Sequence, residues 1–119
     1  MNKVNLADKL SLFHDHWNPR VVGELNGQYV KLAKLKGEFV WHRHDNEDEL
    51  FLVLRGQLTM RLRDREVQLE QGEFFIVPRG VEHQPVAEEE AHVLLFEPAS
   101  TLNTGNVRSE LTREDLETI

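Results

Sequence analysis

The chain has 119 residues, enough for one domain that buries most of its apolar surface without cross-links. Its 14 basic and 21 acidic residues give a net charge of −7, which argues against nucleic acid and anionic membranes as partners. Cysteine is absent, which excludes disulfides and thiolate metal ligands, and neither a secretory signal nor a membrane-length apolar run is found, so we expect a cytoplasmic protein.

A short helix is predicted close to the N-terminus. Asn5 can cap its first turn, apolar residues follow at near-helical spacing as far as Phe13, and Pro19 ends any helix beyond that point. His14 and His16 would lie in this helix, where residues two apart point about 200° away from each other. We therefore interpret this pair as surface histidines and not as ligands of one metal ion.

From residue 21 onward, short strand-like runs recur with turn residues between them. Asn26-Gly27 is a strong hairpin signal, because both central residues of a type I′ turn need a positive φ. Strands are predicted at residues 21–25, 28–35, 38–44, 49–54, 57–63, 66–70, 74–78, 82–86 and 91–98. Because no helix intervenes, this pattern predicts an all-β fold, an antiparallel sandwich or barrel. The charged tail at residues 109–118 is predicted to be a short surface helix or a frayed end.

The predicted strand at residues 49–54, with the sequence ELFLVL, is apolar on both faces. Side chains alternate along a strand, so Glu49 shares one face with two apolar residues, and three leucines occupy the other. On the strand at 38–44, Phe39 and Trp41 are expected to project away from its two histidines. Large apolar patches on monomers are rare, so we expect a homodimer, with the N-terminal helix as the alternative cover.

Three histidines and one carboxylate are spaced as metal ligands. His42 and His44 are two apart on one predicted strand, so both imidazoles point the same way. Glu49 opens the next strand, and His83 follows a Pro-x-Gly turn that would direct it to the same cavity. If these strands are neighbours, the four side chains can surround one ion. Asp48 is the alternative carboxylate, but Glu49 is in phase with the apolar residues of its strand.

Two segments resemble the two sequence motifs of the cupin superfamily. They are Gly37-x4-His42-x-His44-x4-Glu49-x6-Gly56 and Gly72-x5-Pro78-x-Gly80-x2-His83. The resemblance covers about Gly37 to Ala87. It departs from the family in two places: four residues and not five separate Gly37 from His42, and Ala87 replaces an asparagine that often ends the second motif.

The resemblance implies a double-stranded β-helix, which is a jelly-roll barrel, at about residues 21–98 of a single cupin domain of residues 1–119. A short helix would precede the barrel, and a helical or frayed tail would follow it. The metal ligands implied at the barrel core are His42, His44, Glu49 and His83. The sequence is similar in particular to short single-domain cupins labelled mannose-6-phosphate isomerase-like, a label that transfers the fold and not the chemistry.

The predicted cofactor is one divalent transition metal, namely Zn, Mn, Fe, Ni, Co or Cu, because nitrogen and oxygen ligands accept all of these. We predict that the protein acts on or binds a small polar molecule, as a metal-dependent oxygenase or isomerase. The alternative is a barrel that senses or stores a metal or small ligand without catalysis. No general base is identified: Asp45, Glu47 and Asp48 lie in a solvated charge run, and His92 is interpreted as structural.

Overall fold

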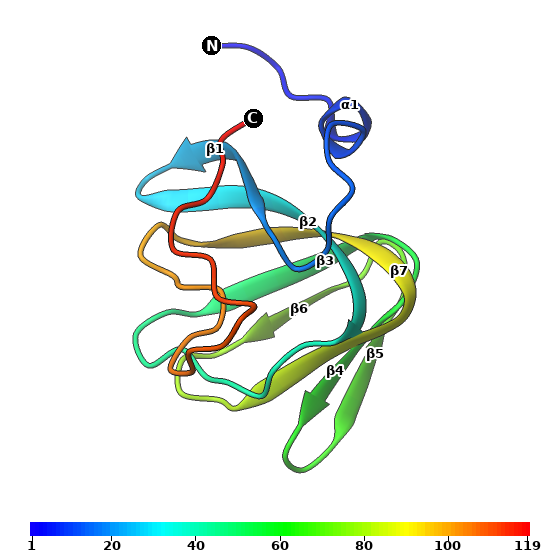
Figure 1. The fold of residues 1–119 in the computed structure, drawn as a ribbon, viewed down its shortest axis with the longest axis vertical. Helices are drawn as coiled ribbons and strands as arrows, with labels where there is room; N and C mark the ends of the chain where they lie inside the picture. Colours follow the sequence, from blue (N-terminus) through cyan, green and yellow to red (C-terminus); the bar gives the residue numbers. More distant parts are fainter.

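The computed structural model describes residues 1–119, and nearly all of its regular structure is β (Figure 1). The single helix is α1 (Leu6–Leu10), and the strands are β1 (Arg20–Leu25), β2 (Gln28–Glu38), β3 (Glu49–Arg55), β4 (Leu58–Leu62), β5 (Glu66–Leu69), β6 (Phe74–Val77) and β7 (His83–Pro98). All pairs of these strands are antiparallel, which confirms the predicted all-β fold. No helix of the chain has the length and apolar character that a membrane crossing requires.

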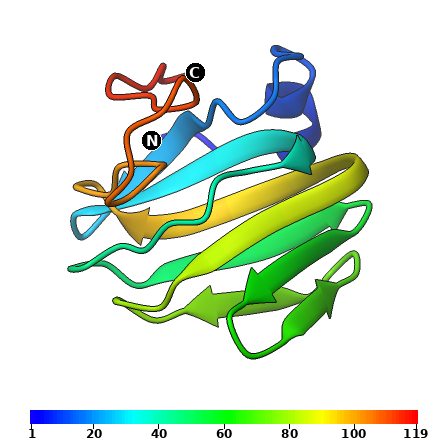
Figure 2. The ribbon, with the colours of Figure 1, turned by 60° about the horizontal axis from the view of Figure 1, so that its bottom comes forward.

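Strand β7 organises the barrel because it pairs with three other strands (Figure 2). It runs antiparallel to β2 over most of its length. Its first part also pairs with β4, and its later part pairs with β3. Strand β1 extends the sheet beyond β2, β6 extends it beyond β3 at the opposite end of the strand order, and β5 pairs with β4. The strands predicted separately at 82–86 and 91–98 therefore form one long strand that belongs to both walls of the barrel.

Two local predictions are confirmed by the structure. The hairpin between β1 and β2 turns at Asn26 and Gly27, whose φ angles are 51° and 76°, and both central residues of a type I′ turn need such positive values. In β3, Glu49, Phe51 and Val53 are buried, and the leucines between them are half-buried. This strand therefore has the predicted phase, and it places a carboxylate inside the barrel.

Phe39 belongs to the main core and not to the outer surface, so its predicted orientation is wrong. Strand β2 ends at Glu38 after an irregularity in its register with β7, and the alternation expected for a strand at 38–44 is therefore lost. Phe39 is buried and stacks on Trp17, with the ring centroids 4.7 Å apart. Trp41 is half-buried beneath an arginine guanidinium 3.8 Å from its ring centroid.

The predicted N-terminal helix exists but is shorter than expected. Asn5 caps it as predicted and accepts a hydrogen bond from the Asp8 N–H at 2.9 Å. The helix ends at Leu10, and Trp17 has a φ of 57°, which an α-helix does not allow. The segment between them is irregular and packs Phe13 against apolar side chains of β1 and β2. Part of the outer sheet face is therefore covered within the chain.

The C-terminal segment forms neither the predicted helix nor a frayed end. It runs alongside β1 (Figure 1), where the Ile119 N–H donates to the Val21 carbonyl at 3.0 Å. Thr112, which was expected near a helix start, shares a 2.7 Å hydrogen bond with Thr104. Gly105 of the same segment lies against the backbone that carries the first two histidines. Side-chain hydrogen bonds and packing on the barrel replace helix formation here.

We expect Gly105→Ala to destabilise the fold by about 2 kcal/mol or more, because backbone strain and overpacking each cost about 1–3 kcal/mol. Gly105 has a φ of 55°, and a Cβ there would overlap the Arg43 carbonyl and lie 3.1 Å from the His42 ring. Gly80→Ala is the matched control, because Gly80 has a φ of 81° but open space around a new Cβ. It should cost only about 1 kcal/mol. Urea unfolding measures both losses, and equal losses would contradict the close packing at Gly105.

Candidate metal centre

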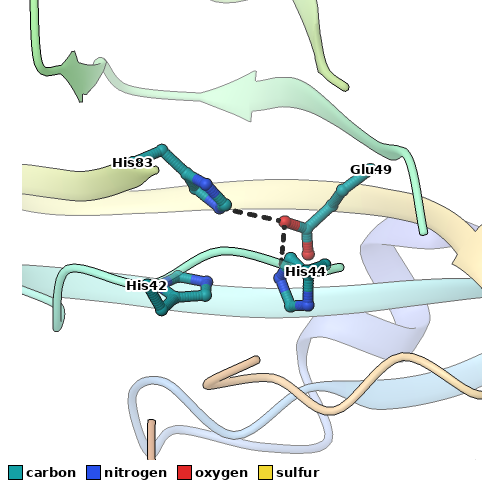
Figure 3. Close-up of side chains that lie close together, drawn as sticks. All are labelled: His42, His44, Glu49 and His83. Atoms are coloured by element: carbon teal, nitrogen blue, oxygen red, sulfur yellow. Dashed lines mark ion pairs between the residues drawn. The ribbon is translucent and has the colours of Figure 1, made fainter. Parts of the chain in front are cut away.

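Four buried side chains meet inside the barrel (Figure 3). They are His42 and His44 from the segment after β2, Glu49 at the start of β3, and His83 at the start of β7. One nitrogen or oxygen atom of each lies within 4.8 Å of those of the other three, and no residue of the cluster is more than 4 % exposed. The structure therefore brings together the residues singled out by their spacing, and their role as ligands stays a prediction.

Backbone hydrogen bonds hold the histidines in place, although the predicted strand at 38–44 is absent. His42 and His83 form an antiparallel pair. The N–H of His42 donates to the carbonyl of His83 at 3.1 Å, and the N–H of His83 donates to the carbonyl of His42 at 2.9 Å. The carbonyl of His44 accepts from the Gly80 N–H at 2.8 Å. The turn before His83 therefore joins the two histidine segments around one cavity.

Glu49, and not Asp48, faces the three imidazoles. Asp48 is exposed and accepts a hydrogen bond from the Arg79 N–H at 2.9 Å, which lowers the pKa of its carboxyl. The other two acids of this charge run bond to polar groups away from the cluster, Asp45 to Arg43 and Glu47 to Ser100. None of these three acids contacts the imidazoles, so none is placed to act as a general base there.

The ring nitrogens of His42 and His83 that face the cluster carry lone pairs. Nδ1 of each ring lies 2.9 Å from a backbone carbonyl, that of Val40 for His42 and that of Val81 for His83. A carbonyl only accepts hydrogen bonds, so Nδ1 must carry the hydrogen. In a neutral ring this leaves Nε2 free to bind a cation, and metal-binding histidines usually donate their other ring nitrogen in this way.

Several polar atoms of the cluster are buried without a hydrogen-bond partner. They are both ring nitrogens of His44, Nε2 of His83 and Oε1 of Glu49. Oε1 of Glu49 lies 3.3 Å from Nε2 of both histidines, longer than the about 2.7–2.9 Å of a charge-assisted hydrogen bond. Two ligands bound to one ion at about 2.0–2.1 Å are about 3.3–3.4 Å apart in tetrahedral geometry. The residues therefore fit a bound cation, which would satisfy the unpaired atoms.

The imidazole of His42 is held in its neutral form. Burial, and to a lesser degree the neighbouring His83, lowers the pKa of His42 to about 4. The hydrogen bond to the Val40 carbonyl and the carboxylate of Glu49 oppose this shift without cancelling it. At neutral pH the ring is therefore uncharged, which is the form that binds a metal ion.

A second set of charged residues inside the barrel, Lys31 and Glu97, was missed by the sequence-based prediction. Nζ of Lys31 lies 2.8 Å from Oε1 of Glu97. Burial and the adjacent Glu49 raise the pKa of Glu97 well above its ordinary value. Burial also raises the pKa of Glu49, but the neighbouring polar side chains of Glu97, His44 and His83 outweigh it and hold that pKa well below its ordinary value. The two buried carboxyls therefore lie close enough to influence each other's ionisation.

The alternation of inward and outward side chains along β2 and β7 contains a signal for this pair. Lys31 is in phase with the buried Ala33 of β2, and Glu97 is in phase with the buried Leu95 of β7. A charged side chain is almost never fully buried unless it is paired. Two opposite charges at inward positions of two strands therefore indicate partners, but their pairing also requires knowing that β2 and β7 are neighbours.

A cavity of about 40 Å³ lies beside the cluster. Its walls are mostly apolar, and His42, Glu49 and Glu97 contribute polar or charged groups to it. Trp17 from the N-terminal segment and Asn103 from the C-terminal segment complete the lining. Two residues of the cluster therefore face a space that can hold a small molecule.

The remaining histidines do not belong to the cluster. His14 is exposed. His16 and His92 bond to different oxygens of Glu90 at 2.7 and 2.9 Å, and these hydrogen bonds lower the pKa of the Glu90 carboxyl to about 2. All three histidines lie outside the group of four that could hold one ion.

Comparisons with known proteins identify a family and several similar proteins. Residues 28–97 match the family described as Cupin domain. The uncharacterized protein YdbB of Bacillus subtilis (strain 168) is 32% identical over 84 residues, which are 70% of this chain and 72% of YdbB. A cupin-2 domain containing protein from Shewanella frigidimarina NCIMB 400 superposes with a TM-score of 0.79 at 47% identity, covering 80% of this chain and 93% of that one. Protein NMB1881 from Neisseria meningitidis superposes with a TM-score of 0.76 at 26% identity, covering 82% of this chain and 100% of that protein's chain.

We expect His42 to make the metal-free protein less stable at acid pH. Below about pH 6.5 the unfolded chain protonates this histidine, whereas the folded chain does not until about pH 4. The free energy of unfolding therefore falls by up to about 3 kcal/mol, through this histidine alone, as the pH falls through that window. Urea unfolding of chelator-treated wild type and His42→Gln at several pH values isolates the contribution. The wild type should lose more stability than the variant, and parallel pH profiles would contradict the assignment.

Proposed function

The chain belongs to the cupin domain family, and we propose that it binds one divalent transition metal ion through His42, His44, Glu49 and His83. One observation carries this proposal: nitrogen and oxygen atoms of these residues face one another in a buried space, most of them without a hydrogen-bond partner. Burying such atoms costs free energy unless a proton or a cation satisfies them.

The chain is a small cupin, and the family match lends no support to the mannose-6-phosphate isomerase label. We treat residues 1–119 as a single domain, with the barrel at about 21–98. The expected ion is Zn, Mn, Fe, Ni, Co or Cu, because three imidazoles and one carboxylate suit all of them. When bound, such an ion supplies Lewis acidity or, if it is redox-active, electron transfer.

We propose that the chain acts on a small polar molecule in the adjoining cavity, as a metal-dependent oxygenase or isomerase. His42 and Glu49 belong both to the cluster and to the cavity wall, so a molecule there lies next to the ligands. Glu97 offers that molecule a hydrogen-bonding group, and the apolar walls keep water away. Screening metal-loaded protein against small hydroxy and carbonyl compounds, with oxygen uptake and product NMR as readouts, tests this activity.

The cavity size favours a second candidate, a barrel that stores or senses a metal or small ligand without turnover. A volume of about 40 Å³ holds only a few atoms, and a larger substrate would require Trp17 or Asn103 to move. The same screen separates the two functions. Turnover with any metal and substrate supports the enzyme, and tight ligand binding without turnover supports the sensor.

We expect wild-type protein to bind about one metal ion per chain and to melt at a higher temperature when loaded. Glu49→Gln should weaken metal binding by more than the about 10- to 100-fold lost when an outer hydrogen-bond partner is removed, because a neutral amide replaces an anionic oxygen. Asp48→Asn is the matched control, since Asp48 bonds only to Arg79, and it should bind like wild type. Competition titration with a chromophoric chelator measures all three proteins. The reverse ranking of the two variants would contradict the assignment of Glu49.

We also propose that two copies of the chain pair through the outer face of β3 and β6. Phe74 and Ile76 of β6 are 60 % and 49 % exposed, and they pair with the half-buried Leu52 and Leu50 of β3. Apolar faces of this kind usually mark interfaces. Phe39, on which the sequence-based prediction partly relied, is buried in the core and is not part of this face.

Light scattering should give twice the 13.9 kDa mass of one chain. Phe74→Glu should reduce this mass towards that of a monomer, because it places a charge in the apolar face. Leu25→Glu is the matched control, since Leu25 is 47 % exposed but lies in β1, at the far end of the strand order from β6. A monomer mass for wild type over a wide concentration range would reject the proposed pairing.

A further inference from the structure

Lys31 and Glu97 form a buried ion pair whose position requires an explanation. The two residues are 1 % and 2 % exposed, and Nζ of Lys31 donates to Oε1 of Glu97 at 2.8 Å. Replacing a buried ion pair by apolar residues of similar volume is often neutral or stabilising. Both side chains lie at inward positions of adjacent strands that otherwise carry apolar core residues. The stability of the barrel alone therefore does not account for this pair.

The second oxygen of Glu97 lacks a partner, although its residue lies beside Glu49 of the metal-binding cluster. Oε2 of Glu97 is buried and has no hydrogen-bond partner. The pairing of Leu50 with Phe96 sets Glu49 and Glu97 side by side on β3 and β7, and both buried residues line the same cavity. Lys31, Glu97 and Glu49 therefore follow one another through the barrel, and Oε1 of Glu49 lies 3.3 Å from Nε2 of His44 and of His83.

We infer that Glu97, anchored by Lys31, is a positioning residue that holds the carboxyl of Glu49 by a hydrogen bond and so keeps it aimed at the metal ion. The inference rests on the proposed function, because it assumes that Glu49 binds the ion. A glutamate has three rotatable side-chain bonds, and fixing them requires contacts to the carboxylate. Carboxylates that bind metals are themselves hydrogen-bonded, and removing such a partner typically weakens metal binding about 10- to 100-fold.

Two substitutions of Glu97 separate positioning from packing. Glu97→Gln keeps an oxygen that accepts from Lys31 and gains an N–H that donates to Glu49, whereas Glu97→Leu keeps the volume and loses both bonds. Because Glu97→Leu leaves Lys31 buried without a partner, it is combined with Lys31→Met, which restores an apolar pair that can fold. Lys34→Met is the matched control, since Lys34 is also a buried lysine of β2 but donates to the Phe13 carbonyl, away from the cluster.

Zn²⁺ affinity is measured by competition with a chromophoric chelator, and the absorption spectrum of bound Co²⁺ reports the geometry of the ligands. The double variant Lys31→Met/Glu97→Leu should bind Zn²⁺ about 10- to 100-fold more weakly than wild type and shift the Co²⁺ spectrum. Glu97→Gln and Lys34→Met should match wild type in both measurements. Thermal unfolding of the metal-free proteins checks that every variant folds.

The outcomes distinguish this inference from the proposed function. If the double variant binds Zn²⁺ with wild-type affinity and gives the wild-type Co²⁺ spectrum, only this inference is overturned, because the metal would then bind without the Lys31–Glu97 pair. Equal weakening in Glu97→Gln and the double variant also overturns it, because the charge of Glu97 and not its hydrogen bond would then matter. Wild-type protein that binds neither Zn²⁺ nor Co²⁺ overturns the proposed function and this inference together.

Discussion

Oε1 of Glu49 lies 3.3 Å from Nε2 of both His44 and His83 in a space that is almost closed to water. The neutral ring of His83 directs a lone pair from Nε2 at this oxygen, because its Nδ1 carries the hydrogen. Two such groups repel unless positive charge lies between them, and a low dielectric strengthens the effect. The surrounding structure nevertheless holds them in place, through the backbone pair of His42 with His83 and the pairing of β3 with β7 that sets Glu49 beside Glu97. This constraint is the basis of the proposed metal site, because a cation at the centre turns the repulsion into attraction.

Two neighbouring strands link this site to the fold. Strand β7 begins with His83 and carries Glu97 near its other end, and β2 carries Lys31 and leads into the segment with His42. Pairing of β2 with β7 therefore closes the barrel and assembles the cluster together with its support. Because the unfolded chain has no such cluster, metal binding and folding should stabilise each other. The core inside the barrel and the chemistry of the site consequently depend on the same strand pairing.

Several features of the site follow from sequence patterns that act locally. Alternation along β3 predicts that Glu49 faces inward with Phe51, and the positive φ needed at Asn26-Gly27 predicts the first hairpin. In both cases the physical cause, a turn requirement or a two-residue period, operates within a few residues of the feature that it predicts. The meeting of His83 with His42 and His44 is different, because it was expected only if their strands are neighbours and from the resemblance to the cupin motifs.

The features that were missed depend on contacts between distant residues. Phe39 turns inward because β2 ends at Glu38 and Trp17 offers a stacking partner from the N-terminal segment. The pairing of Lys31 with Glu97 joins residues on two strands whose adjacency no local pattern reveals. The C-terminal segment packs on the barrel through Thr104 and Thr112 in place of forming a helix. These outcomes are set by tertiary packing, which overrides local propensity.

X-ray absorption at the metal edge tests the central claim most directly, because it identifies the atoms bound to the ion. The protein should be purified without a chelating tag and loaded with one equivalent of Zn²⁺. The predicted spectrum contains the multiple-scattering features of three imidazoles and one further oxygen ligand, all at about 2.0–2.2 Å. A spectrum without imidazole features, or with water oxygens alone, would contradict the assignment of His42, His44, Glu49 and His83 as the metal site.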